Sequence, residues 1–200
     1  MTTSRPVALA ALALMTSIAV SACSSSNETP TEDPKTASAS PSPTAESSAP
    51  AVPADWQTVG LDGVAEISVP SDWTTKATTD ALHTLQAPKD AVGLPPGSAT
   101  IGVNNLAGGD QADELEESAK YVMENDYASY NPKRLPNEVI NGATFYRLQF
   151  ESEAEWYDIY GTVTPDAEHH IVFEWRFDKM ISRKEAEAIW SPVMPTFKML

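Results

Sequence analysis

Cysteine is almost absent from this sequence: among 200 residues only Cys23 carries a thiol. The rest of the chain therefore offers no pair for a disulfide and no thiolate for a zinc site or for nucleophilic catalysis. A domain formed by that remainder has to be held together by its apolar core alone. The single thiol lies near the N-terminus, so its use has to be sought there.

Basic residues are scarce as well. The sequence has 13 Lys and Arg against 28 Asp and Glu, which gives a formal net charge of −15 at pH 7. Binding of a nucleic acid depends on cations that neutralise phosphates, and an anionic membrane surface repels an acidic protein. We therefore expect no nucleic-acid partner, and no attachment to a membrane through surface charge.

The familiar catalytic motifs are missing too: there is no G-x-S-x-G, P-loop, G-x-G-x-x-G or H-E-x-x-H. Only His83, His169 and His170 could act as bases near neutral pH, and His83 is expected to be a partly exposed strand residue. We predict no catalytic residue and no cofactor. A hydrolase with a dispersed site, in which His83 or His169 meets a hydroxyl or a carboxylate, is the enzyme alternative.

The N-terminus has the layout of an export signal. Arg5 precedes an apolar run from Val7 to Val20, roughly 21 Å long as a helix, which is short for a bilayer span. A charged start, a short apolar centre and small residues before a cleavage site are typical of a secretory signal. The run ends in "VSAC", which resembles the bacterial lipobox. The resemblance implies that a signal peptide, residues 1–22, is removed and that Cys23 receives the lipid, whose acyl chains anchor the protein. The alternative is an ordinary signal followed by a coincidental cysteine.

Residues 23–54 have the composition of a tether. Beyond Cys23 they are mainly Ser, Thr, Pro and Ala, with no aromatic side chain and almost no large aliphatic one. Such a segment cannot bury enough apolar surface to fold, and its Pro-rich stretches favour extended conformations. We expect a lipidated, disordered tether over 23–54 and a single domain over 55–200.

Turn signals divide that domain into strands. Asp62-Gly63 and Asn141-Gly142 each lie between alternating apolar segments, as is typical of two-residue hairpin turns. Further strands are predicted over 81–86 and 99–106, separated by a Gly- and Pro-rich loop. The segments 155–164 and 169–178 form another pair, in which Pro165 suits the second position of the connecting turn.

Two helices are also predicted. Asp110 can cap a helix that runs to about Tyr130, with acidic residues in its first turns that suit the helix dipole. Ser182 and Glu185 form a capping box ahead of the second helix. Its apolar residues continue at helical spacing to Leu200, where we expect the C-terminus to be docked, although two prolines should kink or break it.

These elements predict an α+β fold: an antiparallel sheet of about seven strands sandwiched by helices. The order of a hairpin with "ISVPSDW" (Ile67–Trp73), a central helix, a long meander and a closing helix is similar to the Mog1/PsbP-like fold. That group includes bacterial lipoproteins of the LpqN kind. The resemblance covers most of Trp56–Leu200 and implies a non-enzymatic binding or accessory role.

No metal site is expected. His169 and His170 are adjacent in a strand, so their side chains point to opposite faces and cannot easily hold one ion. Asp110, Asp113 and Glu114 lack the pattern of a calcium loop, and helix capping explains them better.

The best candidate for a binding surface is one face of the last three predicted strands. Alternation places seven aromatic and charged side chains opposite the apolar ones: Phe145, Arg147, Trp156, Asp158, Tyr160, Glu174 and Arg176. The turns predict Arg147 near Tyr160, Asp158 near Glu174 and Trp156 near Arg176. Such a face could stack on a sugar or a protein surface and orient it by charge. The alternative is ordinary cross-strand pairing, which a helix lying over this face would favour.

The hypothesis from sequence is a lipoprotein on the outer face of the cytoplasmic membrane of a Gram-positive, actinobacterial cell. Its domain would bind an envelope protein, glycan or lipid as an accessory component, without catalysis. The alternative is a lipid- or solute-binding lipoprotein with an internal apolar pocket. The alternative predicts a continuous cavity, whereas an accessory domain predicts a filled core with an exposed patch.

Overall fold

The structure of the chain, a computed structural model, describes residues 51–91 and 93–200. The predicted signal peptide (residues 1–22), Cys23 and all of the tether except residues 51–54 lie outside the described residues. Within the described part of the chain, no helix is long and apolar enough to cross a bilayer.

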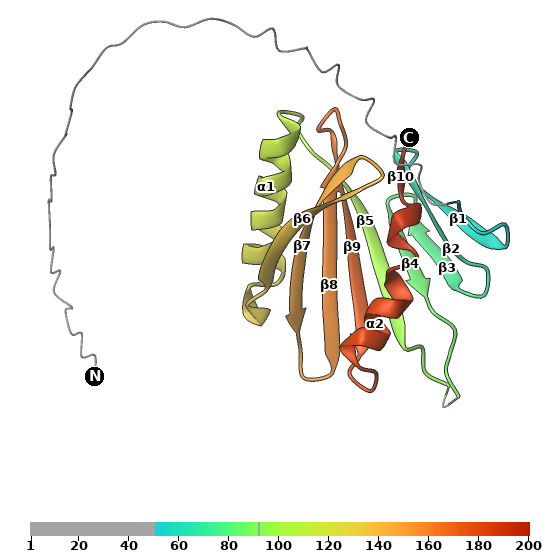
Figure 1. The fold of residues 1–200 in the computed structure, drawn as a ribbon. Coiled ribbons are helices and arrows are strands. Elements are labelled where there is room, and N and C mark those ends of the chain that lie inside the picture. The colour runs from blue at the N-terminus through green and yellow to red at the C-terminus, as the bar shows by residue number, and fades with distance from the viewer. Residues whose placement is uncertain (1–50, 92) are drawn as a thin grey trace, which may run out of the picture. The chain divides into compact units, whose positions relative to one another are not determined.

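A seven-stranded antiparallel sheet forms the centre of the domain (Figure 1). Its spatial order is β3-β4-β5-β9-β8-β7-β6, so β5, β9 and β8 lie in its interior. The strands are β3 (Thr74–Thr79), β4 (Leu82–Gln86), β5 (Gly97–Asn105), β6 (Lys133–Ile140), β7 (Ala143–Glu151), β8 (Glu155–Val163) and β9 (His169–Asp178). The hairpin predicted at Asn141-Gly142 joins β6 to β7, and both residues have positive φ, 47° and 82°, as a type I′ turn requires.

The two ends of the domain form a second sheet that the sequence did not predict. It has the order β1-β2-β10 and consists of β1 (Trp56–Leu61), β2 (Ala65–Pro70) and β10 (Lys198–Met199). The predicted turn at Asp62-Gly63 joins β1 to β2. The end of the chain is docked, as expected, but as a strand and not as the last turns of a helix: the backbone N–H of Leu200 donates to the carbonyl of Val64 at 2.9 Å.

Helix α1 (Gln111–Tyr121) begins where predicted. The Asp110 carboxylate accepts hydrogen bonds from the N–H groups of Ala112 and Asp113 at 3.0 and 3.2 Å and so satisfies two of the free donors of the first turn. The α-helix is shorter than predicted. It continues as a π-helical turn (Val122–Asp126) and a 3-10 turn (Ala128–Tyr130), and turns of this kind recur at functional sites.

Helix α2 (Arg183–Trp190) begins at the predicted capping box. The Ser182 hydroxyl accepts from the N–H of Glu185 at 3.3 Å, and the Glu185 carboxylate accepts from the N–H of Ser182 at 2.7 Å. The helix ends at Trp190, because Pro192 cannot donate a main-chain hydrogen bond. The chain then forms a 3-10 turn (Met194–Thr196) before it enters β10.

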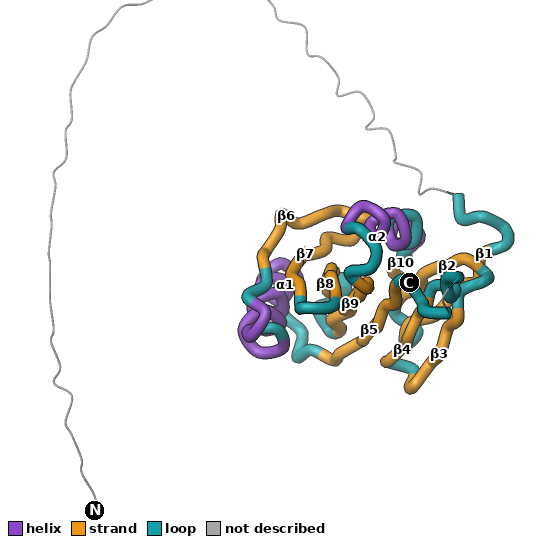
Figure 2. The backbone as a smooth tube through the Cα atoms, turned by 90° about the horizontal axis from the view of Figure 1, so that it is seen from below, coloured by secondary structure: helices purple, strands orange, loops and turns teal. Residues whose placement is uncertain are grey.

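The seven-stranded sheet has a separate core on each face. On one face α2 and the three-stranded sheet cover an aromatic cluster that includes Phe145, Phe173, Trp175 and Phe177. On the other face α1 packs over Tyr146, Leu148, Phe150 and Ile159. Figure 2 shows α1 and α2 on opposite sides of the sheet. The predicted fold class, α+β with a seven-stranded antiparallel sheet between helices, is confirmed.

Candidate functional site

The predicted binding face is divided between the two sides of the sheet. Arg147 pairs with Tyr160, as predicted, but Asp158 pairs with Trp175 and Trp156 with Phe177. The predicted pairs of Asp158 with Glu174 and of Trp156 with Arg176 are therefore wrong by one residue. Because side chains alternate along a strand, a register shift of one residue places every side chain of β9 on the face opposite to the predicted one. Phe145, Arg147, Trp156, Asp158 and Tyr160 lie on the α2 face, whereas Glu174 and Arg176 lie on the α1 face.

Helix α2 and the segments on either side of it cover the five residues on this face. The carboxylate of Asp158, 2% exposed, accepts hydrogen bonds from Arg183 Nη2 and Gln149 Nε2, both at 2.7 Å. Burial raises the pKa of the Asp158 carboxyl above its usual value, and the Arg183 charge and the Gln149 hydrogen bond lower it only in part. The Trp156 indole donates to the carbonyl of Ile181 at 3.2 Å, immediately before α2.

The other members of this group also have packing partners on this face. The guanidinium of Arg147 lies 4.7 Å from the ring centre of Tyr160 and 5.9 Å from that of Trp190 in α2. Phe145 meets Phe197 edge to face at 5.1 Å. Cross-strand pairing beneath a covering layer, the alternative that the sequence left open, therefore describes these five residues, of which Arg147 and Trp156 are partly exposed.

The three histidines lie in different surroundings. His169 and His170 point to opposite faces, as predicted; His170 is 6% exposed on the α1 face, where its Nε2 lies 3.0 Å from the Tyr146 hydroxyl. Burial lowers the pKa of His170 to about 4, so the ring is neutral at pH 7. His83 is more buried than predicted, at 8% exposure, with Nε2 2.9 Å from the carbonyl of Asp80.

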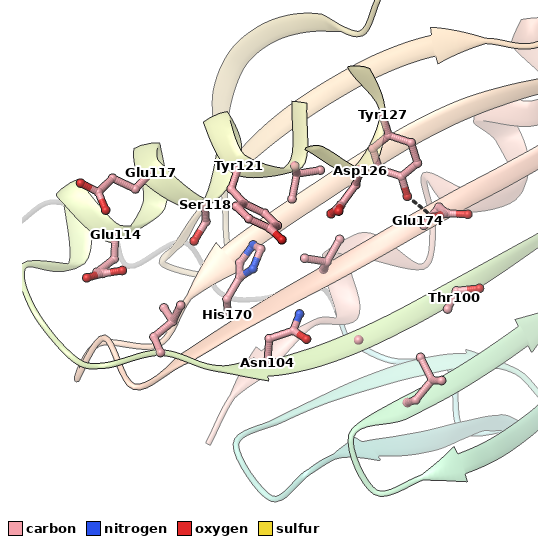
Figure 3. Close-up of a pocket in the computed structure, with 15 residues that line it drawn as sticks. Thr100, Asn104, Glu114, Glu117, Ser118, Tyr121, Asp126, Tyr127, His170 and Glu174 are labelled. Carbon is pink, nitrogen blue, oxygen red and sulfur yellow. Dashed lines mark hydrogen bonds between the residues drawn. The ribbon is translucent and has the colours of Figure 1, made fainter. Parts of the chain in front are cut away.

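An open groove lies beside α1, and it is the candidate site. The helix packs over β7 and β8 and leaves the same face of β9, β5 and β4 uncovered. The space between helix and strands measures about 720 Å³ (Figure 3). Its floor includes Gly102, Asn104, His170 and Val172, and its helical wall includes the following residues: Glu114, Glu117, Ser118, Tyr121, Asp126 and Tyr127.

Two glycines explain why one part of this face is open and another is filled. Gly102 in β5 and Gly161 in β8 flank Val172 in β9. A methyl group built on Gly102 would meet only the side-chain nitrogen of Asn104, at 3.9 Å, so the floor of the groove stays low there. The same group on Gly161 would lie 2.1 Å from the Tyr146 ring. Tyr146 therefore fills the part under α1, and the part beyond α1 is left free.

The groove is acidic. Its lining includes Glu114, Glu117, Asp126 and Glu174 and neither Lys nor Arg. Glu174 is already engaged: it accepts a hydrogen bond from the Tyr127 hydroxyl, and Arg176 Nε lies 3.3 Å from its other oxygen. Burial and the neighbouring Glu174 raise the pKa of Tyr127, which keeps that hydroxyl protonated as a donor. The remaining carboxylates give the groove a negative potential that favours a cationic ligand.

Sequence reasoning missed the groove, although two signals pointed to it. Ser118 lies on the buried stripe of α1 beside the apolar residues Leu115 and Ala119, where a hydroxyl is unusual. Gly102 lies inside a strand, which often marks a place where another group approaches the backbone.

Comparison with known proteins gives a likeness of fold only. No protein-family model and no curated protein matches the chain. Among solved structures, the Ran-binding protein Mog1p of Saccharomyces cerevisiae matches with a TM-score of 0.46 and 10% identity, over 72% of this chain and 94% of that one. A mutant of protein Mog1 matches with a TM-score of 0.43 and 10% identity, over 70% and 86%. A crystal structure from Bacteroides thetaiotaomicron has a TM-score of 0.46 and 16% identity; it covers 73% of this chain, which spans about half, 49%, of that one.

Two of these three structures are Mog1 proteins, and the fold expected from the sequence was Mog1/PsbP-like. At these identities the likeness concerns the arrangement of strands and helices, and what those proteins bind is not carried over to this chain. Its own fold and site define an α+β domain with an open, acidic groove beside a helix.

Proposed function

We propose that this chain is an extracytoplasmic lipoprotein whose domain is a non-enzymatic binding or accessory module, with its ligand in the groove beside α1. The groove carries the proposal. The α2 face is filled by packed side chains, whereas on the α1 face three neighbouring strands lie open to a space of about 720 Å³. Concave spaces with a few convergent polar groups are where proteins usually bind their ligands.

The membrane attachment in this proposal rests on Cys23 and the tether. Two or three acyl chains on one cysteine give a firm anchor, whereas a single chain gives a marginal one. The Pro-rich segment from 24 to 54 would hold the groove away from the bilayer. The domain would thus work on the outer face of the cytoplasmic membrane, where it would meet other envelope components.

The lining of the groove favours a polar partner over a lipid. Leu106, Val122 and Val172 contribute apolar surface, but Glu117 and Asp126 share the same space. A hydrocarbon tail placed there would remove water from these carboxylates without replacing its hydrogen bonds, which is costly. A ligand with positive charge is therefore favoured over the apolar solute of the alternative hypothesis.

The groove also brings a hydroxyl and an imidazole together, from Ser118 and His170. A nucleophile needs a hydrogen-bonded base, and the pKa of that base should be near the working pH. Ser118 makes no hydrogen bond to His170, whose Nε2 faces Tyr146 and whose pKa is lowered to about 4. These observations support binding over hydrolysis.

Photo-crosslinking in intact cells tests the proposal. A photoreactive phenylalanine analogue replaces Tyr121, 61% exposed at the groove, or Met180, 73% exposed ahead of α2, in the full chain. We expect a defined adduct from position 121 and none from position 180. The Cys23→Ala chain should no longer incorporate labelled palmitate. No adduct from position 121, or equal adducts from both positions, contradicts the binding role; palmitate on the Cys23→Ala chain contradicts the anchor.

A further inference from the structure

We infer that the groove binds an extended segment of a partner protein that carries two basic side chains about four residues apart. This inference rests on the proposed binding role of the groove and adds the chemistry of the partner. It follows from three features of the lining: the separation of its charges, the polar groups between them and an exposed aromatic ring.

The acidic groups of the groove are spread along it. Within the described residues, no three His, Cys, Asp or Glu side chains converge closely enough to hold a metal ion. Glu117 lies in α1 and Asp126 ends the π-helical turn, nine residues later. They are roughly 12 Å apart along the helix axis, because α-helical residues rise about 1.5 Å each and the wider π-helical turn rises less. Separated carboxylates match separated cations on one ligand, and a single ion would satisfy only one of them.

The middle of the groove offers neutral hydrogen-bonding groups without partners. Ser118 is 8% exposed, and its hydroxyl makes no hydrogen bond with any described residue although it faces the groove (Figure 3). His170 uses Nε2 toward Tyr146 and leaves Nδ1 without a partner among those residues. Asn104 adds a side-chain amide from β5. A peptide main chain carries a donor and an acceptor at nearly every residue, so it can satisfy such groups.

The rim of the groove suits a guanidinium group. Tyr121 is 61% exposed, lies one turn after Glu117 on α1, and lines the groove with it. An arginine can stack on an aromatic ring while it donates two hydrogen bonds to a carboxylate. Arginine is therefore favoured over lysine at this end.

The distance between the carboxylates sets the spacing of the basic residues. An extended chain rises about 3.4 Å per residue, so four residues span about 14 Å, close to the separation of Glu117 and Asp126. The matching probe is the peptide Gly-Arg-Ala-Leu-Ala-Arg-Gly, with a central leucine for the apolar floor around Val172. Two control peptides keep the length: one has Gln in place of both Arg residues, and the other has the two Arg residues adjacent.

The test measures peptide affinity for the full chain in neutral detergent at low salt, by calorimetry. We expect the spaced peptide to bind about tenfold more tightly than the Gln peptide, and more tightly than the adjacent-Arg peptide. The double variant Glu117→Gln/Asp126→Asn should weaken binding of the spaced peptide about five- to tenfold, a range consistent with two exposed ion pairs. Glu124→Gln/Glu153→Gln is the matched control. It removes the same charge from exposed positions outside the groove and should change the affinity less than about twofold.

Equal weakening by both double variants overturns the inference, because the overall negative charge would then attract the peptide. Equal affinity for the spaced and adjacent-Arg peptides overturns the required spacing. The inference is also overturned if spermidine displaces the peptide and binds with the same affinity, because a free polyamine would then satisfy the groove. An adduct from position 121 in cells, without binding of the spaced peptide, refutes this partner and leaves the proposed function standing. If no adduct forms from position 121 in cells, the proposed function itself is refuted.

Discussion

The two faces of the seven-stranded sheet use the same strands for different purposes. On the α2 face of β9, Phe173 and Trp175 have no exposed surface, whereas Val172 and Glu174, which alternate with them, lie half-buried on the α1 face. The difference comes from the covering layer: α2 and a second sheet cover the first face, whereas on the second face α1 packs mainly over β7 and β8. The α2 face and the covered half of the α1 face therefore stabilise the fold, and the open half of the α1 face is available for binding.

The test with the largest expected effect on stability compares two neighbouring residues of β9. Phe173 contacts the rings of Phe145 and Phe197, so Phe173→Ala leaves a cavity and should lower the free energy of unfolding by about 3–5 kcal/mol. Val172→Ala removes a half-buried side chain at the groove and should cost about 1 kcal/mol. Urea unfolding with a fitted m-value measures both. Equal losses would mean that the two faces contribute alike to stability.

The second test uses the pH dependence of stability. Burial lowers the pKa of His170 to about 4, whereas a histidine in the unfolded chain titrates near 6.5. Between these values the unfolded chain binds a proton that the folded chain does not, so stability falls as the pH is lowered. From pH 7 to pH 4 this one group should remove up to about 3 kcal/mol.

The control for this test is His170→Gln, which keeps a polar side chain in the groove but cannot take up the proton. Denaturant unfolding at several pH values between 4 and 7 should give a flatter profile for this variant than for the natural chain. Parallel profiles would show that His170 is not the group responsible.

The third test compares the covered and open halves of the α1 face. Gly161→Ala places a methyl group only 2.1 Å from the nearest atom of the Tyr146 ring. The clash should lower the free energy of unfolding by about 1–3 kcal/mol. Gly102→Ala places the same group in open space, 3.9 Å from its nearest neighbour, and should stay within about 0.5 kcal/mol of the natural chain. Thermal unfolding measures both, and a large loss at Gly102 would contradict an open floor.

The smallest expected effects concern the helix caps. Asp110→Ala and Ser182→Ala should each cost about 1 kcal/mol, because each leaves free N–H groups at a helix start. Hydrogen exchange distinguishes them: faster exchange should be confined to α1 in the first variant and to α2 in the second. Faster exchange in both helices of either variant would show that the two layers are coupled through the sheet.

Local features of this fold were predictable from sequence because a few adjacent residues determine them. The turns at Asp62-Gly63 and Asn141-Gly142 need residues that tolerate positive φ, and both pairs provide them. The caps at Asp110 and Ser182 likewise depend only on the first turn of each helix.

The register of β9 was not predictable in this way. Apolar residues occupy both faces of a sheet that is covered on both sides, so alternation does not indicate which set pairs with which. The turn before β9 adds no signal, because its left-handed residue is Ala167 at φ 58° and not a glycine. A register error of one residue therefore moved Glu174 and Arg176 to the wrong face.

Ser118 and Gly102 were only weak signals of the groove, whose shape could not be predicted from sequence for a related reason. It exists because α1 packs over β7 and β8 and because Gly102 keeps the floor low beside it. Both facts depend on how segments distant in sequence pack together.

β3 was not predicted because its sequence, "TTKATT", has no large apolar residue.

The last 3-10 turn and the short strand β10 after it, residues 194–199, link the order of synthesis to the completion of the fold. Thr196 donates from its hydroxyl to the carbonyl of Ser68 and accepts from the N–H of the same residue, both at 2.9 Å, across 128 residues of chain. A ribosome or a translocation channel that delivers this chain from its N-terminus releases β1 and β2 first. The edge of β2 then has to wait for nearly the whole domain before its partner arrives. During that interval the nascent hairpin presents an unpaired strand edge, which is open to pairing with another chain.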